Sequence, residues 1–185
     1  MNFCLWLTGL PGSGKSTILK ELAPLLEAAG IRPVVLSLDH LRRIVTPEPT
    51  YSEPERDIVY RALALMAQLL VTEGRRHVII DATAHRRAYR DLARQLIADF
   101  AEIHIHCPLE TCQAREAVRR GQPVEKDLYR RAAAGTLAGA MPGVTTAYEA
   151  PQTPELRLPS DRLSPRQAAE RVIAYLRSRW PDATG

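Results

Sequence analysis

The chain has 185 residues, a formal net charge of +4, 45% hydrophobic residues and 25% charged residues, which is ordinary for a globular protein. No apolar run approaches the roughly 20 residues that span a bilayer, and no basic segment precedes the apolar start, so we expect a cytoplasmic protein without a signal peptide or a membrane association. The charge is too mild to predict a nucleic-acid partner.

Strand-like and helix-like segments alternate along the chain. Short apolar runs predict strands at Phe3–Leu7, Val34–Leu38, His77–Asp81, Ile103–Cys107 and, more weakly, Glu155–Leu158. Helical periodicity predicts helices at Ser16–Ala29, Pro54–Thr72, Arg87–Ala98, Leu109–Arg120 and Pro165–Arg179. We expect Gly30 to cap the first helix at its carboxyl end. The alternation predicts one α/β domain over residues 1–185, with a parallel sheet between two helical layers and ligands at the carboxyl ends of the strands.

The turn after the first strand has the pattern of a phosphate-binding loop. Residues 9–16 read GLPGSGKS, which satisfies G-x-x-x-x-G-K-[ST] between a strand and a helix. Glycines let consecutive N–H groups converge on phosphate oxygens, the lysine reaches the β- and γ-phosphates, and the hydroxyl of Ser16 can join the coordination of Mg²⁺. We therefore predict that ATP is held by Gly9, Gly12, Ser13, Gly14, Lys15, Ser16 and Thr17.

A phosphate-binding loop occurs in switches, motors and kinases. The only asparagine is residue 2, so the N-K-x-D motif of guanine-nucleotide switches is absent, and the chain is too short for most motor ATPases. A small kinase with a helical lid remains. The basic segment from Arg115 to Tyr148 is the candidate lid, because cations there can stabilise the charge of a transferring phosphoryl group. Within it we assign function to Arg115 and Lys126 and expect the other arginines to lie on the surface.

Four segments resemble the adenylylsulfate kinases, P-loop kinases that phosphorylate the ribose 3′-hydroxyl of adenosine 5′-phosphosulfate with Mg·ATP. These segments are FCLWLTGLPGSGKST at 3–17, CPLETCQAR at 107–115, KDLYRRAAAG at 126–135 and YEAPQTPELRL at 148–158. The resemblance implies a sulfate-assimilation enzyme, with ATP and Mg²⁺ as cofactors and adenylylsulfate as the second substrate. A homodimer is compatible with the sequence.

The resemblance also implies roles for single residues. Asp39 matches an aspartate that orients or deprotonates the attacking hydroxyl, and Arg42 matches an arginine that contacts the acceptor nucleotide. Tyr51 would stack on the acceptor base, and Arg56 would hold its phosphosulfate. These residues have alternative readings from spacing alone, because Asp39 also suits a helix N-cap, Tyr51 a core aromatic and Arg56 a surface ion pair.

Three further residues are assigned from the lid and the segment after it. Lys126 looks like the lid lysine that meets the transferring phosphate, and Arg115 resembles the arginine that packs on the adenine of ATP. Met141 stands where the family has the second aromatic residue of the base clamp; its thioether offers an adaptable but poorer stacking surface.

Several positions depart from the family pattern in the predicted acceptor pocket. Besides Met141, they are Ser37, Leu38, Val59, Thr145 and Thr146, together with the segment Ala82–Arg86 after the third strand. The neighbouring Asp81, at a strand end, could act on the metal through water, as in other small P-loop kinases. The chain is therefore an adenylylsulfate kinase, or a relative that phosphorylates another nucleotide-like or small-metabolite hydroxyl. A nucleotide-binding module of a sulfur-assimilation assembly is a third hypothesis.

Histidines and cysteines in the sequence suggest no metal centre. His104 and His106 alternate along a predicted strand and share a face, whereas Cys107 points away from them. The three cysteines lack paired metal-ligand spacing, so we expect reduced and mostly buried thiols.

Overall fold

A computed structural model describes residues 1–118, 128–137 and 139–183. Its five parallel strands form one sheet in the order β2-β3-β1-β4-β5. The strands are β1 (Cys4–Thr8), β2 (Val34–Ser37), β3 (Val78–Asp81), β4 (Phe100–His106) and β5 (Leu156–Pro159). Because β1 lies between β3 and β4, the strand order reverses on either side of it, which is where α/β sheets bind ligands.

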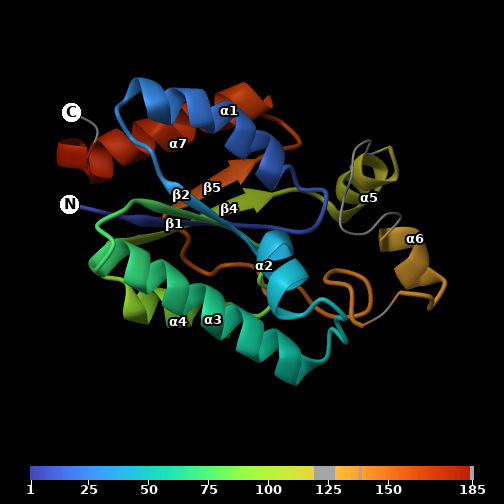
Figure 1. The fold of residues 1–185 in the computed structure, drawn as a ribbon. Helices are drawn as coiled ribbons and strands as arrows, with labels where there is room; N and C mark the ends of the chain where they lie inside the picture. The colour runs from blue at the N-terminus through green and yellow to red at the C-terminus, as the bar shows by residue number, and fades with distance from the viewer. Residues whose placement is uncertain (119–127, 138, 184–185) are drawn as a thin grey trace.

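Helices cover both faces of this sheet, as Figure 1 shows. Helices α1 (Lys15–Ala28) and α7 (Pro165–Arg179) pack together on one face, and α3 (Glu53–Thr72) and α4 (Arg87–Leu96) pack together on the other. The shorter helices α2 (Leu38–Val45), α5 (Leu109–Ala117) and α6 (Leu128–Ala133) lie toward the carboxyl ends of the strands, away from the two termini. A final turn, η1 (Pro181–Ala183), follows α7. This arrangement confirms the predicted three-layer α/β fold.

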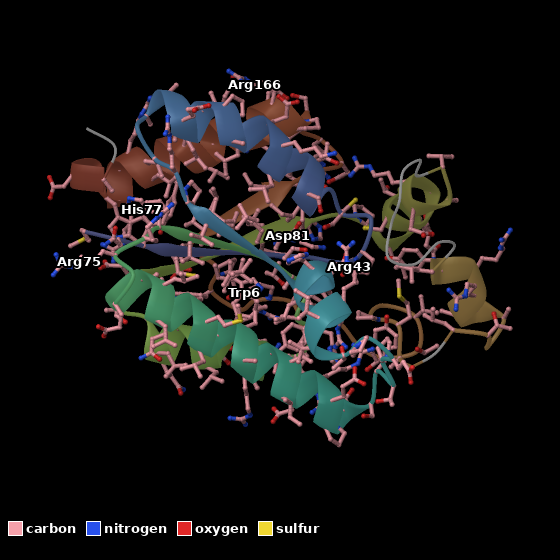
Figure 2. All side chains as sticks on the ribbon, viewed as in Figure 1. Trp6, Arg43, Arg75, His77, Asp81 and Arg166 are labelled. Atoms are coloured by element: carbon pink, nitrogen blue, oxygen red, sulfur yellow. The ribbon has the colours of Figure 1, made fainter. Side chains whose placement is uncertain are left out.

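Alternating side chains of the strands build a separate core on each face. Leu5, Leu7 and Ile79 point into the cluster under α1 and α7, whereas Trp6 and Ile80 point into the cluster under α3 and α4. Figure 2 shows Trp6 between the sheet and α3. Continuous apolar runs are expected for a sheet that is buried on both faces, and this is why the first three strands could be located from the sequence. In the described part of the chain, no helix is long and apolar enough to cross a membrane.

The observed elements agree with the predicted ones except at short helices and at boundaries. Gly30 is the left-handed residue that ends α1, with φ of 73°, and its N–H donates to the carbonyl of Glu27 at 3.0 Å. Helix α2 was not predicted, because its eight residues are too few for periodicity to distinguish a helix from a loop. Helix α6 was also not predicted as a separate element, and α5 ends at Ala117 instead of Arg120.

Arg90, which forms a buried ion pair with Glu102, joins the loop after β3 to the segment that follows the lid. Arg90, 1% exposed, donates to the carboxylate of Glu102, to the carbonyl of Ala84 and, at 2.6 Å, to the carbonyl of Glu149. Burial raises the pKa of Glu102, and the Arg90 guanidinium opposes that rise. The arginine thus fixes two segments that border the carboxyl edge of the sheet.

We predict that Arg90→Met lowers the free energy of unfolding by about 3–5 kcal/mol, because it leaves a buried carboxylate without its main partner. The double variant Arg90→Met/Glu102→Met should be more stable than the single one. Urea denaturation measures both, and Arg61→Met serves as the control, because the exposed Arg61–Asp57 pair contributes at most about 1 kcal/mol. A double variant no more stable than Arg90→Met would contradict this account.

Candidate active site

The phosphate-binding loop joins β1 to α1 in a conformation that requires glycine. Gly9, Gly12 and Gly14 have φ angles of 153°, 79° and 102°. A Cβ atom on Gly9 would lie 2.4 Å from the carbonyl oxygen of Ile105, and one on Gly12 would lie 2.4 Å from that of Cys112. The loop therefore packs against the carboxyl end of β4 and against α5. The Nζ atom of Lys15 donates to the carbonyls of Gly9 at 2.8 Å and Leu10 at 3.0 Å, which folds its side chain over the loop.

The first turn of α1 meets the end of β3. The register of β1 and β3 sets Leu7 beside Asp81, and the hydroxyl of Ser16 donates to Oδ2 of Asp81 at 2.8 Å. Figure 2 shows Asp81 between α1 and α2, at the carboxyl edge of the sheet. The sequence indicated Asp81 as a strand-end carboxylate that could act on the metal through water. The fold brings it to Ser16, whose hydroxyl the loop motif assigns to the metal ion.

A cavity of about 470 Å³ opens over this loop. Its wall contains Gly12, Gly14, Lys15, Ser16, Thr17, Ser37, Asp39, Asp81, Thr83, Arg115, Ser160, Leu163 and Pro165, among other residues. Two carboxylates and a hydroxyl in the same wall form an oxygen-rich donor set that fits Mg²⁺, which prefers oxygen ligands and retains several waters. In the described part of the chain, no group of three or more His, Cys, Asp and Glu side chains is placed to hold a metal ion.

Asp39 lies in the first turn of α2 and faces the cavity. The N-cap of this helix is Ser37, whose side chain accepts a hydrogen bond from the N–H of His40 at 3.4 Å, so Asp39 is not the cap. Its carboxylate is exposed and lines the same wall as Asp81. Ser37, which replaces an aspartate of the family pattern, keeps the capping role that an aspartate could also fill, so the structure does not explain this departure.

Arg115 lies over the other end of the loop, where its guanidinium is anchored to Ser160. Its Nη2 donates to the Ser160 carbonyl at 2.7 Å and its Nη1 to the Ser160 hydroxyl at 3.2 Å. The same Nη1 atom lies 3.9 Å from the position of a Cβ on Gly14, directly beside the start of α1. The apolar side chains of Leu163 and Pro165 line the same cavity as this planar cation.

Arg42 and Tyr51 are held together by a carboxylate that the sequence did not reveal. Glu55 accepts from Arg42 at 2.6 Å, from the N–H of Thr50 at 2.6 Å and from the N–H of Tyr51 at 3.3 Å. Burial alone would raise the pKa of Glu55, but the hydrogen bonds from Thr50 and Arg42 outweigh it and lower that pKa. Tyr51 has φ of 53°, and its ring lies 5.0 Å from the Arg42 guanidinium carbon.

Arg56 and Met141 are both buried, in different surroundings. Arg56 donates to the carbonyls of Tyr51 at 2.9 Å and Ala140 at 2.6 Å, so it is not a surface ion pair. Met141, 3% exposed, packs in a cluster with Cys107, Cys112, Tyr129 and Ala132. Neither residue lines the cavity over the loop, and neither do Arg42 and Tyr51. Of the predicted acceptor residues, only Asp39 lies in its wall.

The lid is docked on the loop by the residues that the structure describes. The hydroxyl of Tyr129, on α6, donates to the carbonyl of Pro11 at 2.8 Å, and Glu116, on α5, accepts from the N–H of Leu128 at 3.1 Å. Lys126, predicted to meet the transferring phosphate, lies outside the described residues. Ser160 was missed because a serine after a strand carries no distinctive pattern. Tyr129 lies in the family segment KDLYRRAAAG, but only the fold shows its contact with the loop.

The two histidines of β4 share a face, as their spacing predicts. The rings of His104 and His106 have centroids 5.6 Å apart. Burial, with smaller contributions from His106 and Arg157, lowers the pKa of His104 to about 4, so its imidazole is neutral at physiological pH. The cysteines are free and buried, and burial raises the pKa of the Cys112 thiol to about 12, which makes it unreactive.

A model of the adenylylsulphate kinase family matches residues 1–159. The chain belongs to this family. It is 36% identical over 172 residues to the adenylyl-sulfate kinase of Picosynechococcus sp., covering 93% of this chain and 92% of that protein. As a member of the family, it is an ATP-dependent kinase that converts adenosine 5′-phosphosulfate into its 3′-phosphorylated form.

Solved structures resemble the whole fold. The Mycobacterium tuberculosis APS kinase CysC, solved in complex with AMPPNP and APS, superposes with a TM-score of 0.82 at 33% identity, covering 95% of this chain and 97% of that one. A sugar kinase from Janibacter sp. has a TM-score of 0.70 at 22% identity, covering 100% and 99% of the two chains. The second likeness concerns the fold alone.

Proposed function

We propose that phosphoryl transfer in this adenylylsulfate kinase takes place where the phosphate-binding loop, Asp81 and Asp39 border one cavity. The observation that carries this proposal is the hydrogen bond of 2.8 Å between Ser16 and Asp81, because it joins the loop that holds phosphates to a carboxylate at the adjacent strand end. Phosphoryl transfer needs positioning and charge stabilisation more than covalent chemistry from the protein, and this arrangement supplies both.

ATP is the phosphoryl donor, and its triphosphate lies along the loop from Gly12 to Thr17. The N–H groups of the loop, the start of α1 and the Lys15 ammonium face its negative charge. Its adenine lies at the other end of the cavity, between the Arg115 guanidinium and the side chains of Leu163 and Pro165. A guanidinium plane stacks well on an aromatic base, and the two apolar side chains supply the remaining contact area.

Ser16 and Asp81 would hold Mg²⁺, Ser16 through its hydroxyl and Asp81 through the ion's water shell. When bound, the ion neutralises charge on the β- and γ-phosphates. The hydroxyl now bonded to Asp81 is free to turn toward the phosphates, while the carboxylate remains at the strand end. Asp39, in the same wall, adds negative charge near the ion.

Asp39 is the residue that orients and deprotonates the attacking hydroxyl. The 3′-oxygen of the acceptor forms a bond to the γ-phosphorus, the bond from that phosphorus to the β–γ bridging oxygen breaks, and the hydroxyl proton moves to the Asp39 carboxylate. The carboxylate is exposed toward the cavity and is therefore accessible to an incoming sugar. Lys126, from the lid, meets the transferring phosphoryl group.

The acceptor nucleotide binds beyond this cavity, toward Tyr51, Arg42 and Arg56. The Tyr51 ring offers a stacking face, and the two guanidinium groups lie 5.0 and 5.8 Å from its centroid. Both arginines carry charge that suits a phosphosulfate. Met141 enters this pocket only if its buried side chain leaves the cluster that it occupies here.

A different hydroxyl acceptor is the second candidate. The observation that favours it is the burial of Met141, because a side chain packed in that cluster does not offer a stacking face to an acceptor base. A polar acceptor without a purine would need only the Arg42 and Arg56 side of the site.

The decisive experiment mixes the purified chain with Mg·ATP and adenosine 5′-phosphosulfate and follows the 3′-phosphorylated product by chromatography. We expect ADP and this product in equal amounts, and no comparable product from other nucleosides, nucleotides or sugars. Transfer to another acceptor at a higher kcat/KM would establish the second candidate. ATP binding with no transfer to any acceptor would instead indicate a nucleotide-binding module.

We predict that Asp39→Asn lowers kcat by about 10²–10⁴-fold and changes the dissociation constant of ATP by less than about threefold, because it removes a proton acceptor and leaves the loop intact. Steady-state kinetics and calorimetric titration measure the two quantities. The half-exposed Asp57, which pairs with Arg61, supplies the control variant Asp57→Asn. Equal losses in kcat and in ATP affinity would show that Asp39 serves nucleotide binding.

A further inference from the structure

Ser160 is a buried polar residue that no sequence motif singled out. It follows directly after β5 and is 6% exposed, yet it lines the cavity over the phosphate-binding loop. Its N–H donates to the carbonyl of His106 at 2.9 Å, which continues the pairing of β5 with β4. This backbone bond fixes the residue independently of its side chain.

The Ser160 hydroxyl is a donor and an acceptor at the same time. It donates to the carbonyl of Ser13, in the loop, at 2.7 Å, and this is shorter than its 3.3 Å distance to the His106 carbonyl. It accepts from Nη1 of Arg115 at 3.2 Å. A hydroxyl has one proton and two lone pairs, so both bonds can form together. Alanine can make neither bond, whereas threonine can make both.

Arg115 depends on Ser160 for its orientation. Its Nη2 donates to the Ser160 carbonyl at 2.7 Å, so two nitrogens of one planar group bind two oxygens of one residue. The remaining contact of Nη1 is the Cys107 sulfur at 3.6 Å, which is a weak acceptor. Arg115 is otherwise an exposed side chain at the end of α5, where a long flexible side chain has many rotamers.

We propose that Ser160 is a positioning residue that fixes the Arg115 guanidinium plane relative to the phosphate-binding loop, and so sets where the base of ATP lies when its phosphates are bound. The inference rests on the proposed placement of adenine against Arg115. Two consecutive hydrogen bonds join the phosphate end of the site to its base end. They run from the Ser13 carbonyl to the Ser160 hydroxyl and from that hydroxyl to the Arg115 guanidinium. The ligand is a purine nucleoside triphosphate, and the expected contribution is pre-organisation for its base.

The test measures the dissociation constants of Mg·ATP and of Mg·tripolyphosphate, which lacks the nucleoside, by calorimetric titration. Ser160→Ala should weaken ATP binding by about tenfold, because the hydroxyl's bonds to Arg115 and to the Ser13 carbonyl are lost and Arg115 keeps only its bond to the Ser160 carbonyl. It should weaken tripolyphosphate binding by less than about threefold. Ser160→Thr, which keeps the hydroxyl, should retain ATP affinity within about threefold. The exposed Ser178 on α7 supplies the control variant Ser178→Ala.

A double-mutant cycle separates positioning from simple support of the loop. If Ser160 acts through Arg115, the double variant Ser160→Ala/Arg115→Ala should bind ATP within about twofold of Arg115→Ala alone. Additive losses of ATP affinity in this cycle would overturn the proposal, and so would a loss of tripolyphosphate affinity equal to the loss of ATP affinity. It would also be overturned by a Ser160→Thr variant that binds ATP as weakly as Ser160→Ala at an unchanged melting temperature. A wild-type chain that does not bind ATP would instead refute the proposed function.

Discussion

The site depends on the parallel register of β1 and β3, which ends both strands at the same edge of the sheet. Leu7 pairs with Asp81, so the turn after β1 and the carboxylate at the end of β3 meet without any side chain having to reach across the molecule. The 2.8 Å bond between Ser16 and Asp81 is the direct result of that alignment. Both strands are buried on both faces, and this core holds the edge in place while ligands bind beside it.

Backbone geometry, more than side-chain chemistry, creates the phosphate-binding end of this cavity. Gly9 and Gly12 approach the carbonyls of Ile105 and Cys112 more closely than any Cβ would allow, and this packing turns the loop toward the start of α1. We propose that Lys15 acts on a triphosphate whose position this backbone geometry defines. The end of the cavity beside Arg115 has a different origin, because the Arg115 side chain is oriented by the hydrogen bonds that it donates to Ser160, directly after β5.

Local patterns predicted the sheet and the loop, whereas long-range contacts decided the rest. Strand runs and the GLPGSGKS turn are properties of consecutive residues, so the sequence alone indicated both. Glu55 could not be recognised as the partner of Arg42 before α2 and α3 were placed side by side, and Ser160 acquires its contacts only after β5 joins β4. The burial of Met141 depends on α5 and α6, and the pattern at 141–149 gives no sign of it.

We propose that Ser16 and Asp81 together hold the metal ion that accompanies the triphosphate at the loop. The most direct measurement is the Mg²⁺ dependence of ATP binding in the wild type, Ser16→Ala, Asp81→Asn and the double variant. We predict that each single variant raises the Mg²⁺ concentration for half-maximal binding, and that the double variant raises it by less than the product of the two effects. Unchanged Mg²⁺ dependence in all three variants would contradict the claim.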